Sequence, residues 1–307
     1  MKILVLGAGA LGGYFGGWLA ESGADVTFLV RAARKAQLDR DGLKIDSAVG
    51  ALRRRIKAIT SEQVTAPADI VLLTAKAYDL DSALGAIRPA VGPQTAILPI
   101  LNGISHIERL VAEFGAARLI GGLARIQATL APDGTILVMG DWNEIVFGEI
   151  GGGLSERTTK LAALFPKPQV RAQAVPDIKQ HLWRKLVHIG TVAAVTTLTR
   201  QAIGTITSTA DGPWLIESTL HSSAAVAAAE GFPIATAALE EMLAKLNTAG
   251  STYKASMLRD MGRGGPTEGA HILGYLAQRA AAHGIDNPIF RIAHANTQAY
   301  ESARAKV

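Results

Sequence analysis

The residues GAGALG near the start of the chain have the glycine spacing of a loop that binds a pyrophosphate. They directly follow Lys2–Leu6, an apolar run that predicts a buried strand, and they begin a predicted helix over Gly12–Ser22. In such a loop the first glycine makes a tight turn, the second lets a phosphate approach the backbone, and the third lets the helix pack on the strand. The N–H groups and the dipole at the helix N-terminus favour phosphate. We therefore expect a dinucleotide to bind at Gly7, Gly9, Ala10, Leu11 and Gly12, the alternative being a merely glycine-rich turn.

The end of the next predicted strand, Asp25–Val30, indicates which dinucleotide binds. A site for NAD carries an acidic residue there, which accepts a hydrogen bond from the ribose 2′-hydroxyl. This chain has Arg31 instead, and Arg34 and Lys35 follow it. Because a guanidinium can hold a 2′-phosphate through two N–H groups at once, we expect NADPH. The alternative is that Arg31 is an ordinary surface arginine.

Lys76 and Asn102 each come shortly after a further predicted strand, Ile70–Thr74 and Thr95–Pro99 respectively. In an open parallel sheet, ligands bind beyond the carboxyl ends of the strands. Either residue alone is more often an ordinary loop residue than a ligand contact. Their joint position at this edge favours a role in binding the cofactor.

The elements that would hold these residues change in kind near residue 170. Before it, apolar strand runs alternate with helical patterns, and Ile136–Met139 and Glu144–Phe147 predict a hairpin with its turn at residues 140–143. This alternation favours an α/β domain with helices on both faces of a parallel sheet. Beyond it we find only helix start and stop signals, at Asp177, Pro213, Gly231, Thr267, Gly284 and Asn287-Pro288. We expect a dinucleotide-binding domain over residues 1–170 and an all-helical domain over residues 171–307.

The composition excludes several classes of protein. The chain has 307 residues, 49% hydrophobic and 19% charged, which is enough apolar surface for the cores of two domains and too much for disorder. It has no cysteine, so disulfide scaffolds, thiolate nucleophiles and cysteine-bound metals are excluded. The formal net charge of +5 is spread along the chain and suits small anionic ligands better than nucleic acid.

The apolar N-terminus could be mistaken for a signal peptide. Repeated glycines and Glu21 leave no clean cleavage site there, and no other run is long enough to span a membrane. No histidine pair has the spacing of metal ligands, and the basic run Arg53-Arg54-Arg55 is expected at the solvated edge of a short strand. We expect a cytoplasmic protein that binds no metal, no membrane and no nucleic acid.

Taken together, the motifs resemble those of the ketopantoate reductase (2-dehydropantoate 2-reductase) family. They run in the family's order over almost the whole chain: Gly7–Gly12, Arg31, Thr74-Ala75-Lys76-Ala77, Asn102-Gly103, Leu182-Trp183-Arg184-Lys185-Leu186, Ser256-Met257-Leu258-Arg259-Asp260, Thr267-Glu268 and Ala282-His283-Gly284-Ile285. The resemblance implies a Rossmann-type domain, then a helical domain like the C-terminal one of 6-phosphogluconate dehydrogenase, with the active site in the cleft between them. It also implies NADPH-dependent reduction of a branched 2-oxo acid, foremost 2-dehydropantoate to (R)-pantoate in pantothenate and coenzyme A synthesis, and a possible homodimer.

The resemblance further assigns roles to single residues. Lys185 matches the catalytic lysine and Glu268 the catalytic glutamate. The NADPH contacts are matched by Arg31, Lys76 and Asn102, and the expected substrate contacts are Asn102, Ile189, Ala193 and Ser256. The chemistry is consistent, because hydride arrival leaves negative charge on the carbonyl oxygen, which a lysine ammonium can stabilise and protonate.

Each catalytic assignment has an alternative. Lys185 could belong to a solvated helix face, and Glu268 could be a carboxylate that the dipole favours at a helix N-terminus. Among the histidines of the second half, His188 lies three residues after Lys185, on the same helical face, and is a rival general acid.

One departure from the family affects the substrate. The family usually has asparagines four and eight residues after the lysine, where this chain has Ile189 and Ala193, and Tyr253 also replaces a common asparagine. The predicted pocket wall is therefore apolar and should hold a substrate hydroxyl less well. This leaves three hypotheses open: the 2-oxo acid reductase, a related 2-hydroxy acid or opine-type dehydrogenase, and a non-catalytic NADPH-binding sensor.

Overall fold

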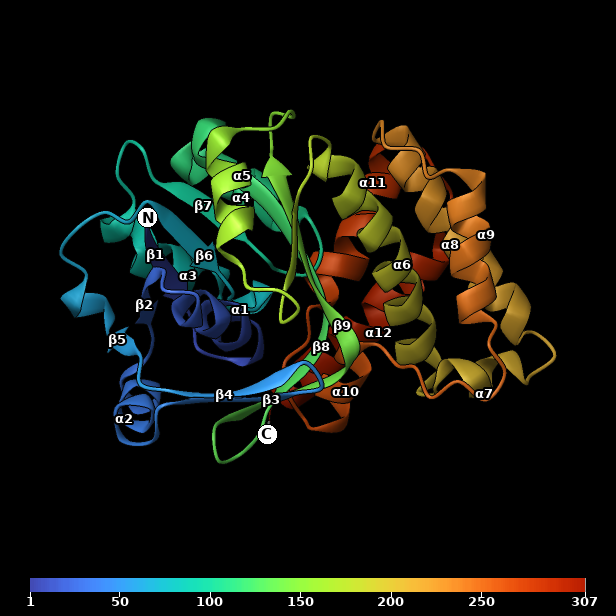
Figure 1. Cartoon of the computed structure of the whole chain (residues 1–307). Helices are drawn as coiled ribbons and strands as arrows, with labels where there is room; N and C mark the ends of the chain where they lie inside the picture. Colours follow the sequence, from blue (N-terminus) through green and yellow to red (C-terminus); the bar gives the residue numbers. More distant parts are fainter. Residues whose placement is uncertain (307) are drawn as a thin grey trace. The chain divides into compact units, whose positions relative to one another are not determined.

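Five short strands in the first hundred residues form one parallel sheet, in the order β5-β2-β1-β6-β7. The computed structural model describes residues 1–306. In it these strands are β1 (Lys2–Leu6), β2 (Asp25–Leu29), β5 (Lys57–Ile59), β6 (Ile70–Leu73) and β7 (Ala96–Pro99). Every residue of β6 and β7 is buried, as expected for strands covered on both faces. The strand expectations for β1, β2, β6 and β7 are confirmed, and Figure 1 shows these strands side by side.

A second sheet has the order β10-β9-β3-β4, and β8 also pairs with β9. Its strands are β3 (Leu43–Ser47), β4 (Gly50–Arg54), β8 (Ile120–Leu130), β9 (Thr135–Glu149) and β10 (Arg171–Ala174). Arg53 and Arg54 lie exposed in β4, as expected. The same part of the chain contains α1 (Ala10–Glu21), α2 (Ala32–Asp41), α3 (Leu80–Ile87), α4 (Ser105–Phe114) and α5 (Glu156–Leu164).

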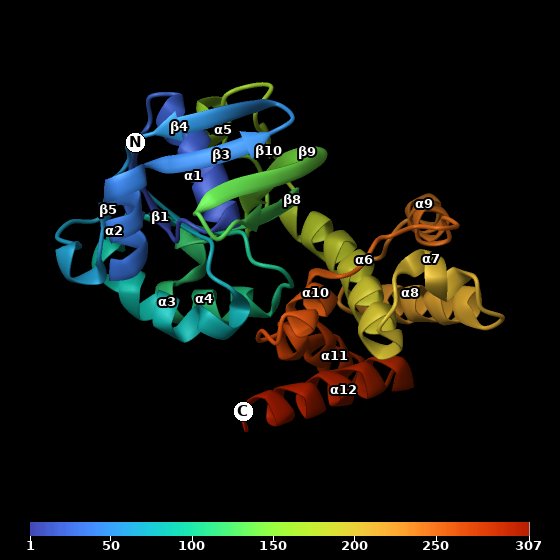
Figure 2. The same cartoon turned by 90° about the horizontal axis from the view of Figure 1, so that it is seen from below.

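Helix α1 lies between the two sheets and contacts strands of both (Figure 2). Two of its glycines show why no larger residue fits. A Cβ on Gly16 would lie 2.8 Å from the ring of Phe28 in β2, and one on Gly17 would lie 2.7 Å from the side chain of Leu43 in β3. Because α1 is buried on both sides, it is apolar nearly all round. This packing explains the apolar, glycine-rich N-terminus.

The predicted hairpin over 136–147 is wrong, because β9 runs through that region as one strand of 15 residues. Its partner β8 pairs Ile126 with Asn143 and Gln127 with Met139, so residues 140–142 bulge out between these pairs. Gly140, with a φ of 71°, supplies the turn-like conformation inside this bulge. The turn residues therefore interrupt a ladder instead of ending a strand.

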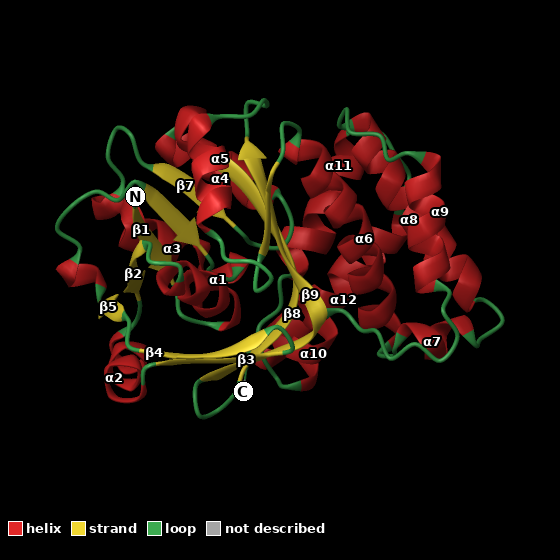
Figure 3. Cartoon of the chain, in the orientation of Figure 1, coloured by secondary structure: helices red, strands yellow, loops and turns green. Residues whose placement is uncertain are grey.

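From Ile178 onward the described residues form helices and no strand, as expected (Figure 3). Residues 171–174, which the sequence placed in the helical part, instead form β10 and pair with β9. The helical elements are α6 (Ile178–Thr199), α7 (Ile203–Thr207), α8 (Gly212–Ala229), α9 (Thr236–Leu246), α10 (Ser256–Gly262), a π-helical turn (Ala270–Gly274), α11 (Tyr275–Ala282) and α12 (Pro288–Arg304). Asn287 caps α12 by accepting a hydrogen bond from the N–H of Phe290 at 3.2 Å. Within residues 1–306, no helix is long and apolar enough to cross a membrane.

The chain divides into two compact units. The first contains residues 1–101 and 107–179, and the second contains Asn102–His106 together with residues 180–307. The short segment Asn102–His106 thus leaves the parallel sheet after β7 and packs with the helices of the second unit. It carries one of the residues predicted to bind the cofactor, Asn102.

Candidate active site

The glycine loop of the first unit has the geometry that a dinucleotide requires. Gly7 has a φ of 93°, and a Cβ on Gly12 would lie 2.2 Å from the Gly7 carbonyl oxygen. The N-cap of α1 is Gly9, and apart from the adjoining backbone no atom of the described residues lies within 4 Å of a Cβ built on it. No side chain caps the first turn of α1, and that turn carries no acidic residue. The donors at this helix start are therefore available to phosphate oxygens, which fits the cofactor expected here.

Arg34 holds this loop, a role that its place in the sequence did not reveal. Its Nε and Nη2 both donate to the carbonyl oxygen of Ala8, at 3.1 and 2.8 Å. The side chain lies half-buried in the first turns of α2, and burial lowers the pKa of its guanidinium. A guanidinium bound to the middle of the loop fixes the backbone that faces the phosphates. The sequence shows that basic residues follow β2 at positions 31 and 34. It does not show that Arg34 binds the carbonyl oxygen of Ala8.

Arg31 lies at the N-cap of α2, directly after β2, where a 2′-phosphate contact is expected. Its side chain is 81% exposed, and its Nη2 lies 3.5 Å from Oδ1 of Asp79. An exposed pair of this kind contributes little to stability, so Arg31 is accessible to a ligand anion. Lys76 lies half-buried at the N-cap of the 3-10 turn Ala77–Asp79, shortly after β6.

Replacing Arg31 with alanine should remove most of the preference for NADPH over NADH. A charge-assisted contact to the 2′-phosphate contributes about 1.5–3 kcal/mol, which corresponds to a preference of roughly 10- to 100-fold. Titration of each cofactor into the two proteins measures this ratio. Arg40, an exposed arginine at the end of the same helix, provides the control variant Arg40→Ala. Equal affinity of the unaltered protein for both cofactors would contradict the assignment.

In the second unit, the two predicted catalytic residues are joined by Asn102. The Nζ of Lys185 donates to Oδ1 of Asn102 at 3.0 Å, and Nδ2 of Asn102 donates to Oε2 of Glu268 at 3.4 Å. Lys185 comes from α6, and Glu268 is 3% exposed just before the π-helical turn. Three residues far apart in sequence thus form one hydrogen-bonded group. The structure thus places the two predicted catalytic residues at opposite ends of one amide.

The loop that carries Asn102 is fixed against the π-helical turn. Gly103 has a φ of 80°, and a Cβ there would lie 3.0 Å from the carbonyl oxygen of His271. Ser105 Oγ lies 3.3 Å from Nδ1 of the same histidine. The N–H groups of His271 and Ile272 both donate to the Glu268 carbonyl oxygen at 3.1 Å. These contacts determine how the amide of Asn102 approaches the Glu268 carboxylate.

The predicted substrate residues differ in how accessible they are. Ile189 and Ser256 are half-buried, whereas Ala193 is 2% exposed. The rings of His188 and Tyr253 stack, with centroids 6.0 Å apart, and His188 Nε2 lies 3.2 Å from the Tyr253 hydroxyl. Tyr253 therefore engages the histidine on the helical face of Lys185. Among the described residues, none forms a hydrogen bond with the Ser256 side chain, and its role as a substrate contact stays a prediction.

His106 is a further unusual residue, although no motif in the sequence marks it. It is 1% exposed, and among the described residues no partner accepts from or donates to either ring nitrogen. Burial, followed by the nearby charges of His271 and Lys185, lowers the pKa of His106 to about 3. The imidazole is therefore neutral near Lys185 at neutral pH, so it adds no second positive charge there.

This buried histidine predicts a loss of stability in acid. The unfolded chain binds a proton at His106 below about pH 6.5, whereas the folded chain does so only near pH 3. As the pH is lowered from about 6.5 toward 3, the free energy of unfolding should therefore fall by up to about 1.4 kcal/mol for each pH unit. Urea unfolding from pH 7.5 to 4.5 measures the slope, which should be shallower in His106→Leu. The exposed His221 gives the control His221→Leu, and an unchanged slope in His106→Leu would contradict the prediction.

Within residues 1–306, no group of three His, Cys, Asp or Glu residues is arranged to hold a metal ion.

Comparison with known proteins gives a consistent result. The sequence profile "Ketopantoate reductase PanE/ApbA" matches residues 3–152, and its C-terminal counterpart matches residues 177–301. An uncharacterized oxidoreductase of Bacillus subtilis, YkpB, is 34% identical over 99% of this chain and 100% of its own. The 2-dehydropantoate 2-reductase of Caulobacter vibrioides is 29% identical over 94% of each chain.

A solved structure agrees with these matches. The crystal structure of 2-dehydropantoate 2-reductase from Methylococcus capsulatus superposes with a TM-score of 0.90, at 29% identity, over 100% of this chain and 99% of that one. Members of this family are NADPH-dependent oxidoreductases that act on CH–OH groups. The expected α/β fold followed by a helical region, the NADPH cofactor and the enzyme class are confirmed. The chain belongs to the ketopantoate reductase family.

Proposed function

We propose that this protein reduces the ketone of a branched 2-oxo acid, with 2-dehydropantoate as the first candidate and (R)-pantoate as its product. The observation that carries the proposal is the hydrogen-bonded group of Lys185, Asn102 and Glu268. A protein that only sensed NADPH would need neither the ammonium nor the buried carboxylate. The cytoplasmic location and a homodimer stay predictions.

Lys185, Asn102 and Glu268 would each have a different role at the carbonyl group of the substrate. Bound NADPH supplies the hydride for the carbonyl carbon. Lys185 then stabilises the negative charge that develops on the carbonyl oxygen and donates a proton to it, giving the alcohol. Asn102 holds the ammonium in one direction through the 3.0 Å contact, so the proton donor is oriented before the substrate binds. Glu268, next to the other end of the amide, can accept a hydrogen bond from the new hydroxyl.

A more apolar 2-oxo acid is the second candidate substrate. Ile189 and Ala193 offer a substrate hydroxyl no hydrogen bond at the two positions where asparagine is usual in the family. Ser256 still supplies a hydroxyl for the carboxylate, so we expect the 2-oxo acid group itself to be required. The lost amides would weaken the contact to a side-chain hydroxyl while leaving the reaction at the ketone unchanged.

A spectrophotometric screen of NADPH oxidation tests the proposal. The panel contains ketopantoate, 2-oxoisovalerate and longer or aromatic 2-oxo acids, with the matching amines added in one arm to detect an opine-type reaction. Turnover of at least one 2-oxo acid without an amine is expected. Turnover only in the presence of an amine would favour the opine-type dehydrogenase. Tight NADPH binding without turnover of any panel member would favour the sensor.

A further inference from the structure

A surface hollow of about 400 Å³ lies in the second unit, at the end of α6. It is lined by Arg200, Lys254, Leu258, Arg259, Met261 and Gly262. Arg200 directly follows α6, and the other five residues lie in α10 or just before it. Because an α-helix rises 1.5 Å per residue, Arg200 lies about 22 Å from Lys185 along the axis of α6. Arg200 is therefore distant from Lys185, and none of the six lining residues belongs to the group of Lys185, Asn102 and Glu268.

Three of the six lining residues are cations, and none is acidic. Over the described part of the chain, no carboxylate forms an ion pair with Arg200, Lys254 or Arg259. The contacts that the two arginines make are to neutral groups. Arg200 donates to Met261 Sδ and to Asn296 Oδ1, both at 3.5 Å, and Arg259 donates to the Lys254 carbonyl oxygen at 3.0 Å. The guanidinium groups are thus held in place while their charges are not neutralised.

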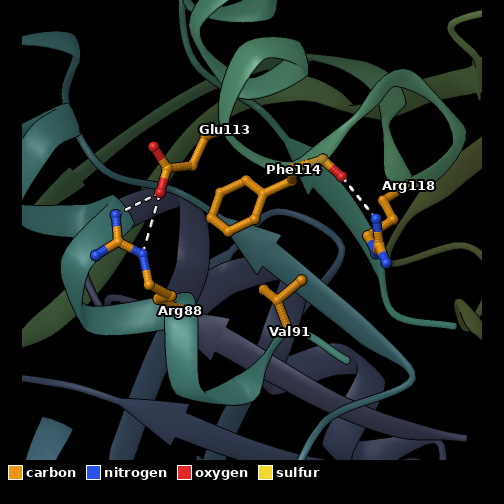
Figure 4. A pocket seen from close by; sticks show the side chains of 5 residues that line it. All are labelled: Arg88, Val91, Glu113, Phe114 and Arg118. Carbon is orange, nitrogen blue, oxygen red and sulfur yellow. Dashed lines mark hydrogen bonds and ion pairs between the residues drawn. The ribbon is translucent and has the colours of Figure 1, made fainter. Parts of the chain in front are cut away.

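A second hollow, in the first unit, shows the opposite arrangement (Figure 4). Its volume is about 280 Å³, and it also contains two arginines. There Arg88 is paired with Glu113, and Arg118 donates to the carbonyl oxygens of Phe114 and Gly92. The charge of Arg88 is therefore already neutralised by Glu113, and the Phe114 ring lies between Arg88 and Arg118. This hollow therefore offers an anion much less than the one beside Arg200.

The remaining lining of the Arg200 hollow is apolar. Met261 is 6% exposed and Leu258 is half-buried, so the two side chains give an apolar surface beside the charges. Three cations match a dianion better than a monoanion, and guanidinium groups bind phosphate oxygens two at a time. A ligand with an organic part can also cover Leu258 and Met261. We propose that this hollow binds a small organic phosphate, with its phosphate on the cations and its organic part on the two apolar residues.

Isothermal titration of the protein saturated with NADPH tests this site directly, because the cofactor then occupies the loop at Gly7–Gly12. The probe is phenyl phosphate at low salt, for which we expect a Kd on the order of 10⁻⁴ M from the size of the ligand. Inorganic phosphate, which lacks the ring, and benzoate, which carries a single charge, should each bind at least about fivefold more weakly. Added salt should weaken binding of phenyl phosphate.

Two variants locate the binding. Arg200→Ala should weaken phenyl phosphate binding by about tenfold or more, the loss of one charge-assisted contact. Arg88→Ala removes the same charge from the other hollow and should leave binding unchanged. Both variants should keep the circular dichroism spectrum and the NADPH affinity of the original protein. The proposal is overturned if phenyl phosphate does not bind at millimolar concentration, if benzoate or inorganic phosphate binds as tightly, or if Arg200→Ala binds it normally. None of these readouts requires turnover, so they are independent of the reductase assignment.

Discussion

Lys185→Ala is expected to lower kcat by about 10²–10⁴-fold, the usual contribution of a general acid, while NADPH affinity stays near its original value. The loss is expected because the Lys185 ammonium, which donates to Asn102 at 3.0 Å, would give its proton to the carbonyl oxygen of the substrate. Single-turnover oxidation of bound NADPH measures the chemical step alone. Cofactor titration of the same variant separates a catalytic loss from a binding loss.

The matched control for this variant is Lys179→Ala, which removes an exposed lysine from the first turn of the same helix, α6. It should turn over at the original rate. A folded Lys185→Ala protein with full activity would show that the proton comes from elsewhere. The next candidate would then be His188, whose Nε2 lies 3.2 Å from the Tyr253 hydroxyl.

The strands that were predicted correctly from the sequence are those that consist of one short apolar run. β1, β6 and β7 lie in the parallel sheet and are buried on both faces, so their residues form short unbroken apolar runs. The glycine loop was equally clear, because a tight turn and a close helix approach exclude larger residues there. Local chemistry fixes both features.

The second sheet was harder to predict because its strands depend on distant partners. β3 and β4 mix charged and apolar residues, and the consecutive Arg53 and Arg54 of β4 are both exposed. Turn residues 140–143 lie inside β9, where Asn143 is 3% exposed and donates to the carbonyl oxygens of Pro168 and Gln169 at 2.8 and 2.9 Å. Those two acceptors lie 25 and 26 residues later in the chain. No local pattern reveals that a turn-type residue will be satisfied in this way.

The candidate site shows the same division. Lys185 and Glu268 were assigned to the reaction through the family resemblance, and Asn102 was expected to contact the cofactor and the substrate. That its amide joins the two is a property of the segment Asn102–His106, which packs with the helices and not with its own strand. The neutral state of His106 was not predicted either. His106 lies in the first turn of α4, and only its burial distinguishes it from an ordinary exposed histidine.

Ile189→Asn is expected to shift the substrate preference toward ketopantoate by about 10²-fold, measured as the ratio of kcat/KM for ketopantoate to that for 2-oxoisovalerate. Ketopantoate carries a hydroxymethyl group that 2-oxoisovalerate lacks. An amide four residues after Lys185 lies on its helical face, where it can bond that hydroxyl. In the unaltered protein the ratio should stay below about 10³, because an apolar wall discriminates by only about 10–200-fold for a group of this size. Ile189 is half-buried, so the smaller amide side chain fits its place.

Ile189→Leu is the matched control, because it keeps the volume and polarity of the wall and should leave the ratio within a few-fold of its original value. If the unaltered protein already prefers ketopantoate by more than about 10³-fold, the hydroxyl must be bonded by other groups, and the apolar-wall interpretation is wrong. His188 and Tyr253, stacked beside that face, would then be the residues to replace. A ratio that rises in Ile189→Asn and not in Ile189→Leu would show that the missing amide, and not the shape of the wall, sets the preference.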